Sequence, residues 1–468
     1  MSRIVIIGGG PAGYEAALVA AQLAADVTVI DPEGAGGACV LQDCVPSKTF
    51  IASSDVVTGY RDTGRFGVHA PGGLEAITVD VPAVHERVRS LAAAQSQDIH
   101  AKLVKAGVRV VAGSARLGAA AVSHHHPVLV TPTDGRAETL AADVVLVATG
   151  ATPRVLPGAE PDGRRVLTWR QIYDLTALPE HLVVVGSGVT GAEFASGYLA
   201  MGVPVTLVSS RDRVMPHEDP DAATVIERVF RERGMAVLGN SRAATVRNAG
   251  DRVEVTLTDG RMVTGSHALM AVGSVPNTGS LGLAGYGVAV DPDGSVPVDR
   301  VSRTSVPGIY AAGDCTGVLP LASVAAMQGR IAMWHALGEA VAPLRLRTVA
   351  ANVFTDPELA SVGATQADVD SGRVAARERM LPLSGNARAK MAEIRDGFVK
   401  LFCRDASGVV LGGVVVAPKA SELILPISLA VANRLTVDQL AQTITIYPSL
   451  SGSLTEAARQ LMEHDGQP

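Results

Sequence analysis

The chain repeats one pattern of apolar and polar positions. In the first copy the apolar run Ile4–Ile7, which is too short for a helix, leads into a glycine-rich turn. A helical pattern over residues 14–23 follows, and then a second apolar run, Val27–Ile30, which ends at Asp31. Short apolar runs bounded by turn signals are typical of buried strands, whereas longer periodic segments are typical of helices. The pattern therefore predicts a strand, a turn, a helix and a second strand.

The second copy begins at Leu182–Val185 and passes through a glycine-rich turn and a helical pattern to the strand Val205–Val208, which ends at Ser209. In both copies, the residue that ends the second strand lies 18 positions after the last glycine of the turn. Both turns have the spacing G-x-G-x-x-G, and their glycines are Gly8, Gly10 and Gly13 in the first copy and Gly186, Gly188 and Gly191 in the second.

This glycine spacing, placed between a strand and a helix, is the fingerprint of a dinucleotide-binding unit. The first glycine makes the tight turn, the second lets the backbone approach a pyrophosphate, and the third lets helix and strand pack closely. The helix N-terminus then presents unpaired N–H groups and the positive end of its dipole to the phosphates. One such motif is weak evidence, because glycine-rich turns are common. Two copies with matched offsets predict that the chain binds two dinucleotides.

The two copies differ at the residue that would contact the adenosine ribose. Asp31 can accept hydrogen bonds from a ribose 2′-hydroxyl, as an unphosphorylated adenosine requires. Ser209 is short and uncharged, and Arg211 lies two residues later, so that a hydroxyl and a guanidinium could receive a 2′-phosphate. The alternative is that Arg211 is a solvated loop charge. We therefore expect FAD at the first site and NADPH at the second, with NADH possible.

Length and composition narrow the class of protein. The 468 residues are too many for one hydrophobic core and suggest about three domains, and 47% apolar residues argue against disorder. A net charge of −6 gives no reason to expect nucleic acid as a partner. No apolar run of 18 residues occurs, so no integral membrane segment is expected. Four cysteines are too few for a disulfide scaffold and fit a reducing, cytoplasmic location, where a cysteine pair is more often catalytic than structural.

Two of these cysteines lie in a characteristic setting. Cys39 and Cys44 are separated by four residues and are followed by a branched apolar residue, Pro46, Ser47 and Lys48. This stretch resembles the redox-disulfide motif of the flavin-linked disulfide reductases, the family of dihydrolipoamide dehydrogenase, glutathione reductase and mercuric reductase. The resemblance covers essentially the whole chain, and it continues at Ala148-Thr149-Gly150, Val272-Gly273-Ser274-Val275-Pro276-Asn277, Tyr310-Ala311-Ala312-Gly313-Asp314, Phe354-Thr355-Asp356-Pro357-Glu358 and Asn386-Ala387-Arg388-Ala389-Lys390.

The resemblance implies an α/β fold. Two Rossmann-like dinucleotide-binding domains are expected, with the NAD(P) domain inserted in the FAD domain, together with a C-terminal α+β dimerisation domain. The C-terminal part should contain strands at 397–402 and 409–416 and two helices, and the protein should be a homodimer. The expected bounds are 1–150 and 276–345 for the FAD-binding domain, 151–275 for the NAD(P)-binding domain and 346–468 for the dimerisation domain.

The resemblance also assigns roles at the site. Cys44 would lie against the flavin as a thiolate, and Cys39 would be the outer, exchanging sulfur. Lys48 would approach the flavin N5 edge and pair with Glu193. Asp314 would hydrogen-bond FAD. The cofactor-binding residues expected in total are Gly8, Gly10, Gly13, Asp31, Gly37, Lys48, Thr149, Gly150, Gly313 and Asp314 for FAD, and Gly186, Gly188, Gly191, Ser209, Arg211 and Gly273 for NAD(P)H.

No metal site is expected. His124, His125 and His126 precede Pro127 between two short strands, and we interpret them as a solvated turn. Cys315 and Cys403 are isolated, and we interpret them as packing residues.

The chain departs from the family near its C-terminus. Disulfide reductases carry a His-Pro-Thr-x-x-Glu segment that reaches the partner subunit's site, where the histidine handles protons for thiol–disulfide exchange. Here Tyr447 stands in place of the histidine, Gly452 in place of the glutamate, and Thr445 at another position that is often histidine. Tyrosine, with an unperturbed pKa of about 10, is a poor proton shuttle at neutral pH. Loss of a positioned acid–base group typically costs about 10²- to 10⁴-fold in rate.

The chain thus keeps Cys39 and Cys44 but lacks the acid–base group that thiol–disulfide exchange uses. We therefore do not expect a dithiol to be the main substrate. We therefore expect hydride to pass from NAD(P)H through FAD to a quinone or other small acceptor, with Tyr447 among the site residues. In this the chain resembles the actinobacterial branch of the family described as NAD(P)H:quinone reductases. One alternative is a reductase for an unidentified disulfide. Another is a non-catalytic, redox-sensing or complex-bound flavoprotein.

Overall fold

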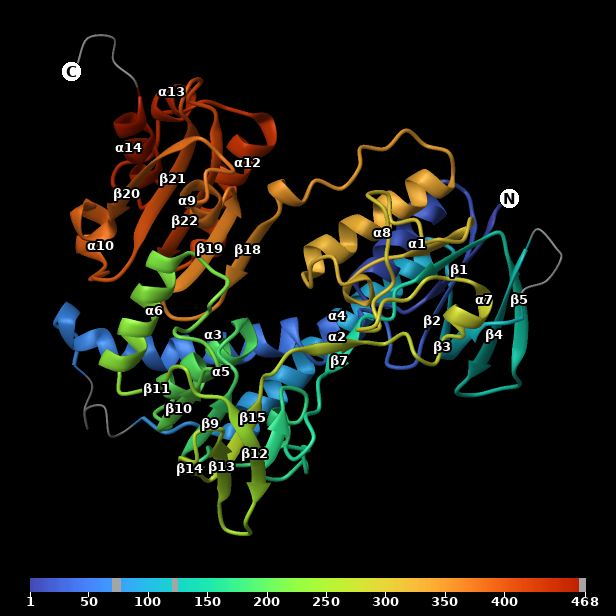
Figure 1. The fold of residues 1–468 in the computed structure, drawn as a ribbon, viewed down its shortest axis with the longest axis horizontal. Coiled ribbons are helices and arrows are strands. Elements are labelled where there is room, and N and C mark those ends of the chain that lie inside the picture. The colour runs from blue at the N-terminus through green and yellow to red at the C-terminus, as the bar shows by residue number, and fades with distance from the viewer. Residues whose placement is uncertain (70–76, 120–124, 463–468) are drawn as a thin grey trace. The chain divides into compact units, whose positions relative to one another are not determined.

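The computed structural model describes residues 1–69, 77–119 and 125–462 (Figure 1). The chain divides into two compact units, each assembled from segments that are distant in sequence. The first unit comprises Met1–Phe50, Pro82–Arg154 and Gly273–Arg345, and the second comprises Ile51–Val81, Val155–Val272 and Leu346–Pro468. The expected division into three domains stays a prediction, because the second unit holds both the inserted and the C-terminal segments.

The first unit is built on a seven-stranded sheet with the order β17-β6-β1-β2-β3-β4-β5. Neighbours from β17 to β3 are parallel, and β3, β4 and β5 are antiparallel. Because β1 pairs with β2 in parallel and a helix joins them, the first predicted strand–turn–helix–strand unit is confirmed. The strands are β1 (Arg3–Ile7), β2 (Asp26–Asp31), β3 (Arg109–Leu117), β4 (His126–Pro132), β5 (Glu138–Ala142), β6 (Val144–Val147) and β17 (Ile309–Ala311).

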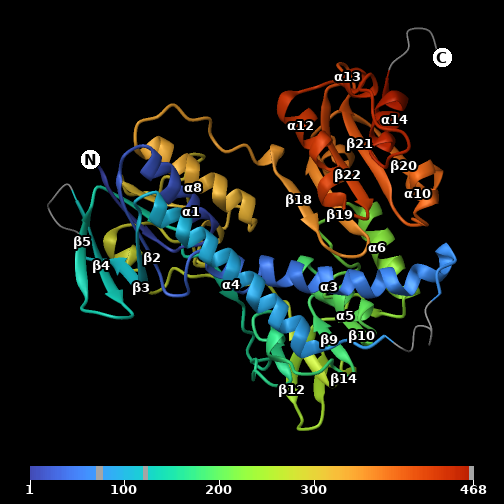
Figure 2. The same ribbon diagram turned by 180° about the vertical axis from the view of Figure 1, so that it is seen from behind.

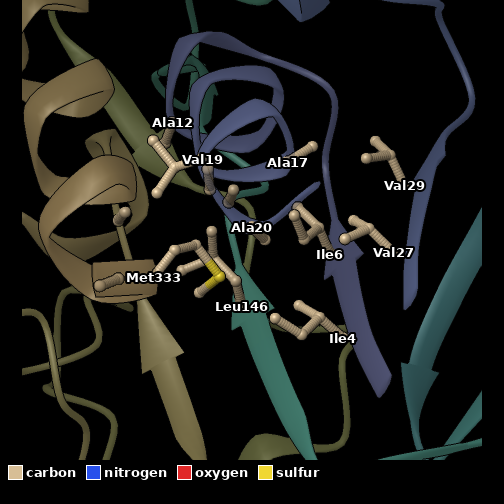
Figure 3. Packing of buried hydrophobic residues seen from close by; sticks show 14 of the residues in the cluster. Ile4, Ile6, Ala12, Ala17, Val19, Ala20, Val27, Val29, Leu146 and Met333 are labelled. Atoms are coloured by element: carbon tan, nitrogen blue, oxygen red, sulfur yellow. The ribbon is translucent and has the colours of Figure 1, made fainter. Parts of the chain in front are cut away.

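Two of the helices that cover this sheet are neighbours in space. In both overall views α1 (Pro11–Gln22) and α8 (Ala322–Ala336) lie side by side (Figures 1 and 2). Ala17 and Ala20 of α1 lie near the apolar side chains of the strands, whereas Ala12 lies on the side of α1 next to α8 (Figure 3). Small residues where α1 meets α8 let the two helices approach closely. A Cβ added to Gly329 of α8 would overlap the carbonyl oxygen of Ala12 in α1.

The remaining elements of the first unit are short apart from one long helix. A two-stranded antiparallel sheet marks the places where the chain leaves this unit and returns to it. These elements are α2 (Gly37–Leu41), the start of α3 (Cys44–Asp62), α4 (Val81–Lys105), α7 (Leu283–Tyr286), β7 (Ala151–Pro153) and β16 (Ser274–Pro276).

The second unit contains the second repeat of the pattern. Its parallel five-stranded sheet has the order β11-β10-β9-β15-β8 and pairs β9 with β10, as the sequence predicts. Between β11 and β15 the chain forms a separate three-stranded antiparallel sheet with the order β12-β13-β14. The elements are β8 (Val166–Thr168), β9 (Leu182–Val185), α5 (Val189–Ala200), β10 (Val205–Val208), α6 (Pro220–Glu232), β11 (Ala236–Leu238), β12 (Ala243–Asn248), β13 (Val253–Leu257), β14 (Met262–Gly265) and β15 (His267–Met270).

The C-terminal part of the second unit is a five-stranded antiparallel sheet with helices (Figure 2). The two predicted strands are present as β21 (Phe398–Arg404) and β22 (Val410–Ala417), beside β18 (Ala350–Val353), β19 (Glu358–Gly363) and β20 (Ala376–Pro382). The expectation of two helices is wrong, because six helices are described in this part: α9 (Gln366–Asp370), α10 (Ala387–Met391), α11 (Ala420–Leu423), α12 (Leu425–Asn433), α13 (Val437–Ala441) and α14 (Gly452–Leu461).

The reason for this miss is helix length. Four of the six helices have only four or five residues, which is less than two turns and too short for apolar periodicity to register. Local caps define them instead. Thr365 and Thr436 form capping boxes, and the Asn386 side chain accepts hydrogen bonds from two backbone N–H groups of α10.

Candidate functional site

The first glycine-rich turn leaves an open backbone surface between two crowded positions. A Cβ added at Gly8 would overlap the carbonyl oxygen of Ala148, and one at Gly13 would overlap the carbonyl oxygen of Gly8. At Gly10, by contrast, the nearest atom would be the carbonyl oxygen of Gly36 at 4.0 Å. The first and third glycines are thus required by packing, whereas the second leaves its backbone accessible to a ligand.

The second turn has the same geometry. A Cβ at Gly186 would overlap the carbonyl oxygen of Ala271, and one at Gly191 would overlap the carbonyl oxygen of Gly186. At Gly188 no described atom would lie within 4 Å. The helices α1 and α5 begin directly after Gly10 and Gly188, which serve as their N-caps without any side-chain cap. Both turns therefore offer a helix N-terminus and a bare backbone, as a pyrophosphate requires.

Asp31 lies at the end of β2, beside the first turn. One carboxylate oxygen accepts the Gly9 N–H at 2.6 Å, and the other accepts the N–H groups of Glu33 at 2.7 Å and Gly34 at 2.9 Å. Burial raises the pKa of Asp31, and these backbone donors oppose the rise. The carboxylate thus fixes the loop that follows β2 against the glycine-rich turn.

Further predicted FAD-binding residues follow β6 and β17, which are neighbours in the sheet. The Thr149 Oγ1 atom is buried and has no hydrogen-bond partner within the described part of the chain. Gly150 and Gly313 have φ angles of +65° and +83°, which glycine adopts without strain. The Gly313 N–H donates to the side chain of Gln328 at 2.8 Å, and burial raises the pKa of Asp314. A buried hydroxyl without a partner fits a polar ligand at this position.

Cys39 and Cys44 are brought together by a short break between two helices. Cys39 lies in α2, and Cys44 is the first residue of α3. The Cys44 thiol forms a hydrogen bond with Cys39; this contact, burial and the charges of Asp43 and Asp314 raise the pKa of Cys39. Lys48 lies one turn farther along α3 and is half-buried. Gly37, with a φ of +56°, lies against the glycine-rich turn.

Glu193 is buried in α5 of the second unit, and one of its carboxylate oxygens accepts the backbone N–H of Phe354 at 3.0 Å. Lys48 belongs to the first unit. The Lys48–Glu193 pair therefore stays a prediction. Gly273, another residue expected to bind NAD(P)H, has a φ of +91° and open space where a Cβ would point.

Ser209 has a different role from the one expected. Its side chain is fully buried, and its hydroxyl bonds to the Ser187 hydroxyl at 2.7 Å and to the carbonyl oxygens of Arg211 and Arg213, both at 3.1 Å. The hydroxyl thus shapes the loop after β10. Arg211 is exposed, and its guanidinium makes no hydrogen bond or ion pair within residues 1–69, 77–119 and 125–462.

Sequence reasoning missed Arg213. Its Nε is buried and has no hydrogen-bond partner among the described residues, and Arg213 lies on the same loop as Arg211. The sequence does contain a signal for it, because two arginines, Arg211 and Arg213, follow β10 two positions apart. Two guanidinium groups on this loop offer donors for an anionic group.

Tyr447 and Gly452 line one groove of the second unit. The groove has a volume of about 590 Å³, and Asn386 and Thr445 also contribute to it. Tyr447 is 86% exposed, and its neighbour Ile446 is 81% exposed. Gly452 begins α14, and an added Cβ there would meet its nearest atom, the Ser449 hydroxyl oxygen, at an ordinary 3.7 Å. A Cβ at position 452 therefore fits without a clash.

The histidine tract is more structured than a solvated turn. The His125 Nδ1 atom lies 2.7 Å from a carboxylate oxygen of Asp143. His126 begins β4, and its Nδ1 atom lies 2.9 Å from the hydroxyl oxygen of Tyr286 in α7. His124 lies outside the described residues. Within the described ranges, no group of three or more His, Cys, Asp or Glu side chains could hold a metal ion. Cys315 and Cys403 are both buried, as packing residues should be.

None of the helices in the described part of the chain combines the length and apolarity needed to span a membrane.

Comparison with known proteins gives matches over nearly the whole chain. A protein of Mycobacterium tuberculosis described as NAD(P)H dehydrogenase (quinone) is 61% identical over 99% of this chain and 95% of its own length. Dihydrolipoyl dehydrogenase of Chlorobaculum tepidum is 34% identical over 99% of this chain and 97% of its own. The crystal structure of LpdA from Mycobacterium tuberculosis matches with a TM-score of 0.95 and 61% identity, covering 99% of this chain and 100% of that one.

Two family models cover most of the sequence. The model described as pyridine nucleotide-disulphide oxidoreductase matches residues 2–329, and that of the family's dimerisation domain matches residues 349–458. The groove with Tyr447 and Gly452 lies within or directly beside the second range. Membership implies FAD and NAD(P)H as cofactors. The chain therefore belongs to the pyridine nucleotide-disulphide oxidoreductases, a family of flavoprotein enzymes that oxidise or reduce nicotinamide dinucleotides.

Proposed function

We propose that the protein is an NAD(P)H:quinone reductase that passes a hydride from NAD(P)H through FAD to a quinone. The observation that carries the proposal is the exposed Tyr447, paired with Gly452 in one groove, where disulfide reductases of the family place a histidine and a glutamate. The name NAD(P)H dehydrogenase (quinone), given to a relative with 61% identity, supports the proposal.

The residues present fit both cofactors. In the first unit, the open backbone at Gly10 and the partnerless Thr149 hydroxyl fit the pyrophosphate and the polar groups of FAD. In the second, the open backbone at Gly188 fits the pyrophosphate of a nicotinamide dinucleotide. When bound, FAD supplies an isoalloxazine ring that takes up a hydride and releases electrons to an acceptor singly or in pairs.

The surroundings of Cys39 also favour an acceptor other than a disulfide. Exchange requires a thiolate, and a thiol with a raised pKa forms little of it at neutral pH. The hydrogen bond with Cys44 and burial raise the pKa of Cys39, the sulfur expected to exchange. Tyr447 stands where disulfide reductases of the family place the histidine that handles protons. A quinone reduced at the flavin needs neither.

We further propose that NADPH is the preferred donor. Arg211 is exposed without an ion pair in the described chain, and the buried Nε of Arg213 has no partner there. Guanidinium groups bind phosphate through charge-assisted hydrogen bonds, and an unpaired guanidinium has its donors available. The 2′-phosphate distinguishes NADPH from NADH, so these two residues are the expected source of the preference.

A second candidate function is the reduction of a disulfide. The contact between the Cys39 and Cys44 thiols favours it, as do dihydrolipoyl dehydrogenases with 31% and 34% identity to the chain. In this case water would have to replace the missing proton handler.

A panel of electron acceptors separates the candidates. Steady-state oxidation of NADPH is followed with several quinones, with lipoamide and with oxidised low-molecular-weight thiols. We expect quinone turnover to exceed lipoamide turnover by about 10²-fold or more, the cost of a missing acid–base group. Faster turnover with a disulfide would contradict the proposed function. Negligible turnover with every acceptor would instead point to a redox sensor or a subunit of a larger complex.

A further inference from the structure

A lysine is buried in the middle of an apolar strand of the second unit. β21 reads Phe-Val-Lys-Leu-Phe-Cys-Arg, and all of its residues but the last are buried. The Lys400 side chain is 1% exposed. An ammonium group is costly to bury unless it is paired and hydrogen-bonded.

The Lys400 ammonium uses all three of its donors. Its Nζ lies 3.0 Å from Oδ2 of Asp219, 2.6 Å from Oδ2 of Asp221 and 2.7 Å from Oε1 of Gln366. An ammonium has three N–H groups and no acceptor, so this set of partners satisfies it. The Asp219 side chain is itself only 3% exposed. Lys400 and Asp219 therefore form a buried ion pair, whereas the Asp221 side chain is 50% exposed and connects this pair to the surface.

Asp219 connects this network to a helix end. While Oδ2 of Asp219 accepts from Lys400, its Oδ1 accepts the backbone N–H groups of Asp221 at 3.0 Å and Ala222 at 3.2 Å. Asp219 is the N-cap of α6, and its carboxylate holds the first turn of that helix. Lys400 thus fixes the position from which α6 begins.

The loop that ends at Asp219 carries the two arginines proposed to bind the 2′-phosphate. Residues 209–219 connect β10 to α6. The Ser209 hydroxyl holds the start of the loop, and the Val214 N–H donates to Glu227 of α6 at 3.1 Å. The first half of the loop is held by the chain after β11, where the Asn240 N–H donates to the Arg211 carbonyl oxygen at 2.7 Å. The second half is held by α6 and its N-cap, through Val214 and Asp219. A shift of the α6 N-terminus would therefore act on the loop through Val214, the neighbour of Arg213.

We propose that Lys400 is a positioning residue for the nicotinamide dinucleotide, which acts through Asp219 to hold the loop 209–219 in the shape that receives the 2′-phosphate of NADPH. This inference rests on the proposed use of NADPH. Stability alone does not account for the network, because apolar residues of similar volume often replace a buried ion pair without loss of stability. A lysine in a strand that is otherwise apolar instead fixes one geometry of the helix end.

The test compares two nucleotide fragments that differ only in the 2′-phosphate. Titration calorimetry on the FAD-loaded protein gives dissociation constants for 2′,5′-ADP and for 5′-AMP in wild type and in Lys400→Met. We expect Lys400→Met to weaken 2′,5′-ADP binding about tenfold, a typical loss for misplaced charge-assisted hydrogen bonds, with less than about a twofold change for 5′-AMP. KM for NADPH should rise accordingly, while kcat with a quinone and KM for NADH stay unchanged.

Two further variants make the result decisive. Lys390→Met removes an exposed lysine of the same unit and should change neither affinity. Asp219→Asn keeps a good N-cap but loses the charge that faces Lys400, and it should weaken 2′,5′-ADP binding selectively even if Lys400→Met does not fold.

The outcomes distinguish this inference from the function on which it rests. A wild type that binds both fragments equally would overturn the NADPH assignment and this inference with it. A wild type that prefers 2′,5′-ADP, with the same preference retained in Lys400→Met or Asp219→Asn, would overturn the role of Lys400 alone. An equal loss for both fragments would also overturn it, because that is the effect of general damage.

Discussion

At the scale of single residues, Ser209 shows how a residue at a predicted binding position can be committed to shaping its own loop. Its hydroxyl is fully buried and committed to Ser187 and to two backbone carbonyl oxygens of the loop. A carboxylate introduced at this position would be buried and would face the carbonyl oxygens of Arg211 and Arg213, so it would disrupt the loop rather than repel a phosphate. The exposed Arg211 is therefore the better place to test coenzyme preference.

Replacing Arg211 with serine should shift preference towards NADH. Loss of one charge-assisted contact with the 2′-phosphate is expected to raise KM for NADPH about tenfold and leave KM for NADH within about twofold. Arg164→Ser, at an exposed position of the same unit, is the matched control. Equal KM values for NADPH in Arg211→Ser and wild type would mean that Arg211 is a solvated loop charge.

The proposed path of electrons predicts that Cys39 is dispensable for quinone reduction. Cys39→Ser should keep most of the quinone turnover, because the outer sulfur is needed for exchange with a disulfide and not for transfer at the flavin. Cys315→Ser, which changes a buried packing thiol, controls for the general effect of the substitution. A drop of about tenfold or more with intact FAD content would show that electrons pass through the sulfur pair.

Restoring the missing proton handler should restore disulfide chemistry. Tyr447→His combined with Gly452→Glu is expected to raise lipoamide turnover by about 10²-fold while quinone turnover changes little. The structure removes a steric objection, because a Cβ at position 452 meets its nearest neighbour at 3.7 Å. Each single variant serves as a control. If lipoamide turnover does not increase in a correctly folded double variant, the two replacements are not what limits disulfide reduction.

At the scale of elements, the two glycine-rich turns are sterically equivalent, and each glycine has a separable role. A Cβ at Gly191 would overlap the carbonyl oxygen of Gly186, whereas Gly188 has open space and a φ of −72° that alanine can adopt. Packing and ligand access are thus assigned to different positions of one motif.

Two alanine substitutions should separate these roles. Gly191→Ala is expected to destabilise the protein by about 1–3 kcal/mol, because the backbone must move to relieve the overlap. Gly188→Ala should keep the wild-type melting temperature and weaken NADPH binding, because its methyl group occupies the space that the pyrophosphate needs. Thermal unfolding and NADPH titration check both. A Gly188→Ala protein with wild-type affinity would contradict the assignment of this turn to the coenzyme.

The sequence was sufficient to predict elements that carry a repeated or a spaced signal. The strands and helices around both glycine motifs followed from short apolar runs at fixed offsets, whereas the fold class followed from the resemblance to a known family. The helices of the C-terminal part did not, since caps such as Thr365 and Asn386 define them rather than periodicity. Nor could the sequence show that Ser209 faces inward or that Lys400 is buried, because Ser209 bonds to Ser187, 22 positions away, and Lys400 bonds to Asp219, 181 positions away.

At the scale of the whole molecule, the match of residues 349–458 to the dimerisation domain predicts a homodimer. Apolar side chains such as Ile444, 98% exposed, and Ile446 are typical of surfaces that a partner covers. Light scattering at micromolar concentration should give twice the chain mass of 48.1 kDa. Ile444→Asp should shift this equilibrium towards the monomer. A wild-type protein of 48.1 kDa in solution would contradict the prediction.

The order of segments in the first unit has a consequence for synthesis on the ribosome. β17 (Ile309–Ala311) completes a sheet whose other strands all precede residue 148, and Gly313 and Asp314 follow it. At about 5–20 residues per second, translation reaches β17 roughly 10–30 s after β6. The sheet must wait for that interval with six of its seven strands formed and the β6 edge uncovered, and the predicted flavin-binding residues after β17 are added last. Nascent chains stalled at residue 300 should therefore fail to retain FAD. Chains stalled far enough beyond residue 345 for that residue to have left the ribosomal exit tunnel should retain it.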